Sequence, residues 1–298
     1  MKYPGDLLSD IALLKELADA SDAISFERFQ SQDLIIETKP DTTPVTDADR
    51  TVEKKIREIL SSERPADKIV GEEFGSPESI HPNERYWVID PIDGTKNFLR
   101  GVPIWATLIG LVHRDENGRD RVIAGIVSSP ALFRRWYAAD SFGAFTEVNG
   151  GPAVQISVSR VASLSDASLS FSDLVGWGER KDLYVAFMER AWRVRGIGDF
   201  WSHMLVAEGA VDIAAEPTLA LWDMAAVAIV VKEAGGRFSD LDDNEGPFGK
   251  SGVSTNGILH ETFKSWRERK INTFYIIIKK NYMFACWPLF HNKLTLWN

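Results

Sequence analysis

The chain has 298 residues, of which 44% are hydrophobic and 26% charged, and its formal net charge is −9. These values are ordinary for a soluble globular protein with one large domain or two smaller ones. The acidic balance argues against nucleic acid as the main partner, because binding to a phosphate backbone requires a basic surface. The single cysteine, Cys286, excludes an internal disulfide framework and a zinc site made of several thiolates.

The N-terminal residues contain acids throughout and no long apolar core, which argues against a signal peptide. The apolar runs of the chain fall short of the roughly 20 residues that a membrane span requires. We therefore expect a cytoplasmic protein that does not enter a membrane.

Residues 1–151 are predicted to form an α+β half. Apolar residues recur at helical spacing from Leu7 to Ala18 and again from Val52 to Leu60, on either side of the polar loop 39–50. Strand-like runs follow, and the stretch before residue 151 resembles a hairpin. The expected strands include residues 69–71, 87–90 and 107–112.

Residues 152–262 are predicted to form an α/β half, because short strands alternate with helical stretches. The expected strands lie near residues 169–172, 192–198 and 212–216, and the expected helices near 184–190, 200–209 and 222–236. With little linker between the halves, the whole is predicted to be a layered α+β and α/β structure.

Residues 263–298 differ in composition from the rest, with seven Lys/Arg and only one acid. One interpretation is a basic interaction tail. The alternative, which we favour, is an extension outside the domain, such as the product of a shifted or fused reading frame.

The stretch WVIDPIDGTKNF, residues 87–98, runs from an apolar segment into two aspartates, a proline and a glycine. Its dipeptides are ordinary turn formers, so a simple turn is one interpretation. In the second interpretation, the proline bends the chain so that Asp90, Asp93 and the Ile92 carbonyl face one cation. The N–H groups of Gly94 and Thr95 would then form a seat for phosphate.

Further acids are expected near these two aspartates, because strands of one sheet bring their ends to a common edge. They are Asp41, Asp47, Asp49, Glu72, Glu73 and Asp223. Carboxylates that converge without a cation raise one another's pKa, so convergence implies a bound cation. Oxygen ligands without nearby His or Cys point to Mg²⁺, or to Mn²⁺, rather than to zinc.

Three segments, GEEFG, DPIDGTKNF and WDMAAVAIVVKEAGG, resemble in this order the inositol monophosphatase family of Mg²⁺-dependent, lithium-sensitive phosphatases. The resemblance extends from the N-terminal helix to about residue 258. It implies an αβαβα sugar-phosphatase-type fold, two or three metal ions for each site, a small phosphate ester as substrate, and a homodimer.

The resemblance also implies roles for individual residues. Metal ligands would be Glu72, Asp90, the Ile92 carbonyl, Asp93 and Asp223. Asp47 and Thr95 would orient and deprotonate the attacking water, with Glu72 also at the catalytic centre. Gly94 and Thr95 would hold the phosphate through their N–H groups, and Lys39 would supply a positive charge. We interpret Asp41, Asp49 and Glu73 as solvated or structural acids.

The segments RGVPIWATLIGL, SSPALFRRWYAA, ASLSFSDLVGW and GDFWSHMLVAEGAVDIAAEP are most similar to the histidinol-phosphate phosphatases of this family. Asp199 stands where inositol-specific members carry a small hydroxyl residue, and Glu216 matches a substrate-facing glutamate. Two acids suit a substrate that carries an ammonium group and an imidazole. Alternatively, Asp199 forms an ion pair with Arg193 or Arg195.

The sequence leaves both the substrate and the activity open. The substrate could be inositol 1-phosphate or a related sugar phosphate, and the chain could be a catalytically silent homologue that binds other macromolecules. We interpret His203, on a predicted helix, as structural. Trp105, Phe200 and Trp201 could form a pocket wall or belong to the core.

Overall fold

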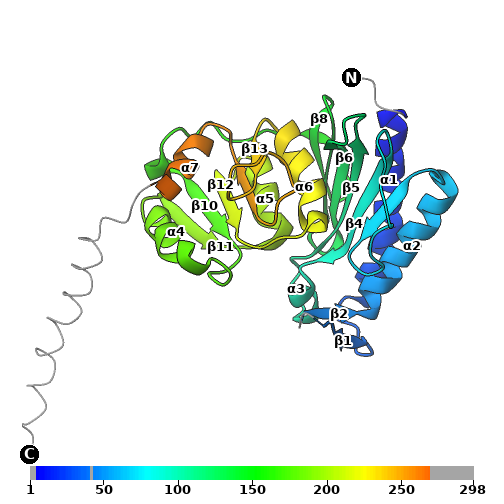
Figure 1. The fold of residues 1–298 in the computed structure, drawn as a ribbon. Helices are drawn as coiled ribbons and strands as arrows, with labels where there is room; N and C mark the ends of the chain where they lie inside the picture. The colour runs from blue at the N-terminus through cyan, green and yellow to red at the C-terminus, as the bar shows by residue number, and fades with distance from the viewer. Residues whose placement is uncertain (1–4, 41–42, 269–298) are drawn as a thin grey trace, which may run out of the picture.

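The computed structural model describes residues 5–40 and 43–268. Their elements stack as five layers in the order helices, sheet, helices, sheet, helices (Figure 1). The predicted αβαβα layering is confirmed. The N-terminal half supplies the first outer helices and all strands of the larger sheet but the last, which the C-terminal half supplies together with the remaining three layers.

The larger sheet has seven strands in the sequential order β3-β4-β5-β6-β7-β8-β9. Only β3 and β4 are parallel; the remaining neighbours are antiparallel. The strands are β3 (Lys68–Gly71), β4 (Arg85–Asp93), β5 (Ala106–Arg114), β6 (Asp120–Ser129), β7 (Arg134–Ala139), β8 (Gly143–Val148) and β9 (Val154–Gln155). β4, β5 and β6 are nearly continuous hydrophobic runs because helices cover both faces of the sheet.

Two long helices, α1 (Leu7–Arg28) and α2 (Asp47–Glu63), cover the outer face of this sheet. Their apolar stripes, which include Leu14, Leu17 and Ile56, are buried against side chains of β4, β5 and β6. Both predicted helices are confirmed. A small hairpin of β1 (Ile36–Thr38) and β2 (Pro44–Thr46) connects them, and Thr46 caps the start of α2.

The middle layer consists of α5 (Asp199–Ala207) and α6 (Leu221–Glu233). Eight of the thirteen residues of α6 are buried, because sheets pack on both sides of it. Two glycines of the larger sheet permit this close packing. A Cβ atom at Gly110 would lie 2.8 Å from the Cβ of Ala225, and one at Gly125 would lie 2.9 Å from the Cα of Ala226.

The smaller sheet has five strands in the order β11-β10-β12-β14-β13. β10 is parallel to β11 and β12, and β14 is antiparallel to its neighbours. The strands are β10 (Ser168–Phe171), β11 (Arg193–Gly196), β12 (Ile213–Glu216), β13 (Arg237–Ser239) and β14 (Gly252–Thr255). The last layer, α4 (Lys181–Met188) and α7 (His260–Glu268), covers its outer face (Figure 1).

The sequence predicted that the domain ends before residue 263. This prediction is corrected by α7, which continues the folded domain past that residue. Phe263 and Trp266 are only 3% and 2% exposed and pack with Tyr184 and Phe187 of α4. The apolar residues at positions 263 and 266 are one helical turn apart, so they face the sheet together. Residues 269–298 of the predicted tail lie outside the described residues. No helix in the described ranges is long and apolar enough to cross a membrane.

We expect Trp266→Ala to lower the free energy of unfolding by about 3–5 kcal/mol, because it removes a large buried side chain. The control is Trp192→Ala, since Trp192 is 68% exposed, and its effect should stay within about 0.5 kcal/mol. Urea unfolding of both variants measures the difference. Equal stability of the two variants would contradict the packing of α7.

Candidate active site

Three acids from two layers meet at the edge of the larger sheet. Asp90 and Asp93 end β4, and Asp223 lies in the first turn of α6. Each offers a carboxylate oxygen, and these oxygens all lie within 4.8 Å of one another. The predicted convergence of Asp90, Asp93 and Asp223 is therefore present in the structure.

Backbone N–H groups hold each of the three carboxylates in place. Asp90 Oδ1 accepts from the N–H of Ile92 at 3.0 Å, and Asp93 Oδ2 accepts from the N–H of Phe200 at 2.8 Å. Asp223 Oδ2 accepts from the N–H of Ala220 at 2.7 Å. These contacts orient the acids before any ligand arrives.

The acids repel one another strongly. Burial, followed by the charges of Glu72, Asp93 and Asp223, raises the pKa of Asp90 well above its usual range. Burial and the charges of Asp199 and Asp223 raise the pKa of Asp93 in the same way. Burial raises the pKa of Asp223 to about 6, with Glu72 adding to the rise.

Such a group fits a divalent cation. Three oxygen donors from carboxylates suit a hard metal ion, and the positive charge would remove the repulsion that now favours protonation. Asp90, Asp93 and Asp223 are thus the residues that would hold the ion in this structure.

Glu72 and Lys39 lie beside the three acids. Glu72 follows β3, which is parallel to β4 and pairs Gly71 with Ile89, so its backbone is next to that of Asp90. Lys39 Nζ donates to Glu72 Oε1 at 2.7 Å and forms an ion pair with Glu73 at 2.5 Å. Burial would lower the pKa of Lys39, but the two glutamates raise it overall. Lys39 therefore offsets part of the negative charge of the two glutamates here.

Asp47, at the start of α2, accepts from the Ile35 N–H at 3.1 Å and pairs with Arg28 at 2.9 Å. Thr95 lines the cavity beside the acids, and its hydroxyl donates to the Ile92 carbonyl at 3.1 Å. Asp47 and Thr95, the two residues predicted to orient the attacking water, therefore contact different partners in this structure.

Gly94 connects β4 to the short helix α3 (Thr95–Leu99). Its φ of 83° lies in the left-handed region that favours glycine. A Cβ atom at this position would lie 2.9 Å from the Ile104 carbonyl oxygen and 3.4 Å from Asp199 Oδ2. Only glycine therefore fits between the aspartates and the opposite wall.

A cavity of about 490 Å³ opens next to the three acids. One wall comes from residues 93–97, after β4. The facing wall comes from the ends of β10, β11 and β12, which are parallel and therefore end at one edge. This second wall contains Ser172, Asp173, Asp199 and Glu216. Crevices at the carboxyl ends of strands are common ligand sites in layered α/β proteins.

Asp199 is the first residue of α5 and has a φ of 52°, a strained conformation for a residue other than glycine. Its Oδ2 accepts from Asn97 Nδ2 at 2.9 Å. Burial, followed by the charges of Glu216 and Asp223, raises the pKa of Asp199 to about 7. Within the described residues Asp199 thus pairs with Asn97, and the alternative of an ion pair with Arg193 or Arg195 is not realised.

His203 also lines the cavity. This histidine was interpreted from the sequence as purely structural. It follows Asp199 by four residues on α5, and this spacing places both side chains on one helix face. That spacing was the available signal. Among the aromatic residues, Phe200 lines the cavity, whereas Trp105 packs with Phe98 in the core.

Two of the remaining acids, Asp49 and Glu73, make structural contacts. Asp49 is 1% exposed and accepts from the Thr46 N–H at 2.8 Å in the capping box of α2. Glu73 is paired with Lys39. Asp41 lies outside the described residues.

The family model for the inositol monophosphatase family matches residues 6–274 of the chain. The chain belongs to the inositol monophosphatase family. Its match extends past residue 258, where the resemblance seen in the sequence ended, and includes all of α7. Membership implies dependence on a divalent metal, in agreement with the three converging acids.

Two similar proteins are histidinol-phosphatases. The one from Mycobacterium tuberculosis is 53% identical over 254 residues, which cover 85% of this chain and 95% of that protein. The one from Streptomyces coelicolor is 51% identical over 258 residues, which cover 86% of this chain and 96% of that protein. Among solved structures, an inositol monophosphatase from Thermotoga maritima has a TM-score of 0.74 at 29% identity, covering 88% of this chain and 96% of its own.

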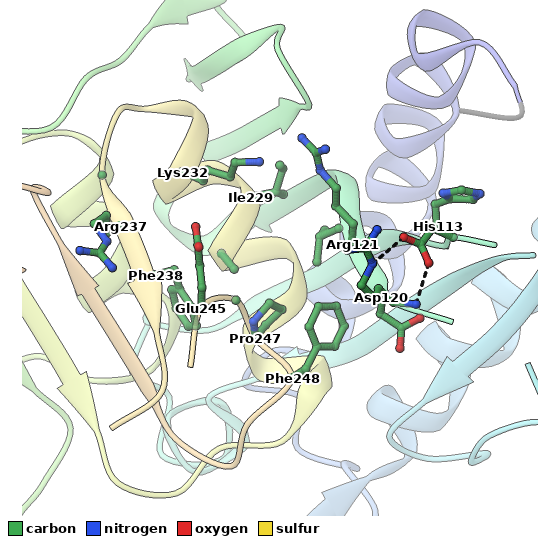
Figure 2. A pocket seen from close by; sticks show the side chains of 16 residues that line it. His113, Asp120, Arg121, Ile229, Lys232, Arg237, Phe238, Glu245, Pro247 and Phe248 are labelled. Carbon is green, nitrogen blue, oxygen red and sulfur yellow. Dashed lines mark hydrogen bonds and ion pairs between the residues drawn. The ribbon is translucent and has the colours of Figure 1, made fainter. Parts of the chain in front are cut away.

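A second cavity, of about 460 Å³, lies at the opposite end of α6 (Figure 2). Ile229 and Lys232 of α6, Phe238 of β13 and the segment around Phe248 form one side, and Arg121 of β6 lies on the opposite side. β5 reaches this cavity at His113, whereas its first residue, Ala106, pairs with Asp93. The two cavities therefore lie near opposite ends of strand β5.

We expect the stability of the metal-free protein to fall as the pH rises from about 4 to about 7. Asp199 and Asp223 have folded-state pKa values of about 7 and 6, above the ordinary 3.8. The folded state therefore binds more protons, and the stabilisation is lost as the pH passes through these values.

A divalent cation should offset this loss, because it binds the ionised carboxylates of the folded state. Thermal unfolding at several pH values, with EDTA or with excess Mg²⁺, measures both effects. A melting temperature at pH 7.5 that does not respond to the cation would contradict a metal site.

Proposed function

We propose that this protein is a Mg²⁺-dependent phosphomonoester hydrolase whose substrate is histidinol phosphate, with a role in histidine biosynthesis. The observation that carries the proposal is the position of Asp199 and Glu216 in the cavity that also contains Asp93 and Asp223. The names of the relatives at 51–53% identity support the same substrate.

The chemistry of the cavity favours a substrate with positive groups beside its phosphate. Asp199 and Glu216 lie at the wall opposite the three acids. The charges of both raise the pKa of Asp93, and the charge of Glu216 raises that of Asp199. A neutral polyol would leave these charges without a partner. The ammonium and imidazole groups of histidinol can pair with them.

The metal site is proposed to use Asp90, Asp93 and Asp223, joined by Glu72 and the Ile92 carbonyl. To bind the cation, Glu72 would have to give up its hydrogen bond with Lys39. The Ile92 carbonyl would likewise have to give up its hydrogen bond with the Thr95 hydroxyl. Magnesium, when bound, supplies an acidified water and stabilises the departing oxygen. We favour Mg²⁺ over Mn²⁺, with two or three ions for each site.

The remaining site residues bind and orient the reactants. We propose that the N–H groups of Gly94 and Thr95 hold the phosphate, in the gap where a Cβ would collide with Ile104. Asp47, with the Thr95 hydroxyl, would take the proton of the attacking water. Lys39 would contribute a positive charge near the phosphate. The water would attack phosphorus in line and release histidinol.

Family resemblance also leads us to propose a homodimer that is cytoplasmic and inhibited by lithium. A runner-up substrate is inositol 1-phosphate or a related sugar phosphate, since solved relatives include inositol monophosphatases. A catalytically silent binding protein is disfavoured, because none of the proposed acidic ligands is replaced by another residue type.

We expect phosphate release from histidinol phosphate to require Mg²⁺ and to exceed release from inositol 1-phosphate and fructose 1,6-bisphosphate. Asp90→Asn should reduce the rate by at least about 10²-fold, because a catalytic metal contributes several kcal/mol. Asp166→Asn, an exposed change, should have no effect. A substrate panel with a phosphate assay measures the rates. Release from no ester at all would favour a catalytically silent binding protein.

Asp199→Asn should lower kcat/KM for histidinol phosphate about 10-fold or more and change that for inositol 1-phosphate less, since it removes one charge that faces the cationic substrate. Asparagine tolerates the left-handed backbone of this position, whereas threonine would add strain. Steady-state kinetics with both esters test the difference. Equal losses on the two esters would overturn the role of Asp199 in specificity.

A further inference from the structure

Two buried polar atoms at the end of the cavity face each other without a hydrogen-bond partner. His203 is 2% exposed and Glu216 is 5% exposed. His203 Nε2 lies 3.5 Å from Glu216 Oε1, and within the described residues neither atom makes a hydrogen bond. Leaving such groups unsatisfied is costly, so the pair requires an explanation.

The second ring nitrogen of His203 is held by the smaller sheet. His203 Nδ1 lies 2.7 Å from Ser254 Oγ, and Ser254 of β14 pairs with Ala214 of β12, two residues before Glu216. The imidazole ring also packs against Phe238, with the ring centroids 5.8 Å apart. The ring of His203 on α5 is therefore held by contacts with β13 and β14, next to the strand that carries Glu216.

This arrangement decides where the proton of a neutral imidazole belongs. An ionised carboxylate can only accept, so the contact with Glu216 is favourable when Nε2 carries the hydrogen. Nδ1 is then an acceptor, and the Ser254 hydroxyl donates to it. Ser254, His203 and Glu216 thus form a chain of donors that ends on the carboxylate.

The charge of Glu216 also reaches Tyr184 of α4. Tyr184 has a buried hydroxyl without a hydrogen-bond partner among the described residues, and burial, followed by the negative charge of Glu216, raises its pKa. Glu216 itself and His203 both line the cavity.

We propose that His203 is a positioning residue for substrate recognition. Its Nε2–H holds Oε1 of Glu216, which turns Oε2 toward the cationic part of the substrate. We expect the 3.5 Å contact to close to hydrogen-bond distance in the substrate complex, because contacts in a site commonly tighten there. This role rests on the proposed function, because it requires a substrate with a positive group.

The test compares two esters in four variants: histidinol phosphate, and glycerol 2-phosphate, whose alcohol part carries no charge. His203→Phe keeps the ring shape and removes both nitrogens, and it should raise KM for histidinol phosphate roughly 10- to 100-fold. It should change KM and kcat for glycerol 2-phosphate by less than about 3-fold. His203→Gln, which returns an N–H near the position of Nε2, should recover most of the loss.

Ser254→Ala should give a smaller rise in KM for histidinol phosphate, because it frees the ring without removing Nε2. The matched control is His260→Phe, since His260 is equally buried but contacts Thr255 and Asp243 away from the cavity. It should affect thermal stability alone.

The outcomes that would overturn this role are distinct. Equal changes on both esters, or a His203→Gln variant no better than His203→Phe, would assign His203 a merely structural role. An unchanged KM in all His203 variants would also overturn the proposal. If His203→Phe does not fold, His203→Gln and Ser254→Ala decide between these outcomes. Wild-type protein that does not hydrolyse histidinol phosphate would instead overturn the proposed function, and this role with it.

Discussion

The repulsion among buried carboxylates where β4 meets α6 is the constraint on which the rest of this structure depends. Asp90, Asp93 and Asp223 come from two different layers, yet their oxygens lie within 4.8 Å. Burial and mutual repulsion raise their pKa values, so the folded chain needs protons or a cation at this point. Packing of the fold keeps these carboxylates together, and at neutral pH a bound cation would make this arrangement favourable. A site of this kind is suited to metal-assisted chemistry.

The helix α6 makes this arrangement rigid. It lies between the two sheets, and the absence of side chains at Gly110 and Gly125 lets its alanines approach the larger sheet closely. Asp223 in its first turn is therefore fixed relative to β4 by packing that extends along the whole helix. Interiors are densely packed, so a shift of α6 would change the distances between the acids.

Substrate selection uses a different part of the fold. Asp90, Asp93 and Asp223 lie on β4 and α6, whereas Asp199 and His203 lie on α5 and Glu216 ends β12 of the smaller sheet. The left-handed conformation of Asp199 and its contact with Asn97 join the two walls of the cavity. A family with this fold can therefore keep its hydrolytic chemistry and alter its substrate through the second wall.

The sequence by itself determined the family, the layered fold and the acids that converge. Apolar spacing predicted α1, α2 and the buried strands. The segment DPIDGT alone left a simple turn and a cation site open, and its order with GEEFG and WDMAAVAIVVKEAGG indicated the family. Signals of this kind depend on residues that are close in the chain, so they can be recognised without knowledge of the fold.

Only the tertiary structure decided the contacts between residues far apart in the chain. Asp199 pairs with Asn97 rather than with an arginine, Lys39 pairs with Glu72 and Glu73, and α7 buries Trp266 beyond the predicted boundary. The spacing from Asp199 places His203 on the same helix face as that acid, but nothing near His203 in the chain reveals its contact with Glu216. Its position follows from the packing of α5 on the smaller sheet, and such packing is set by the whole chain at once.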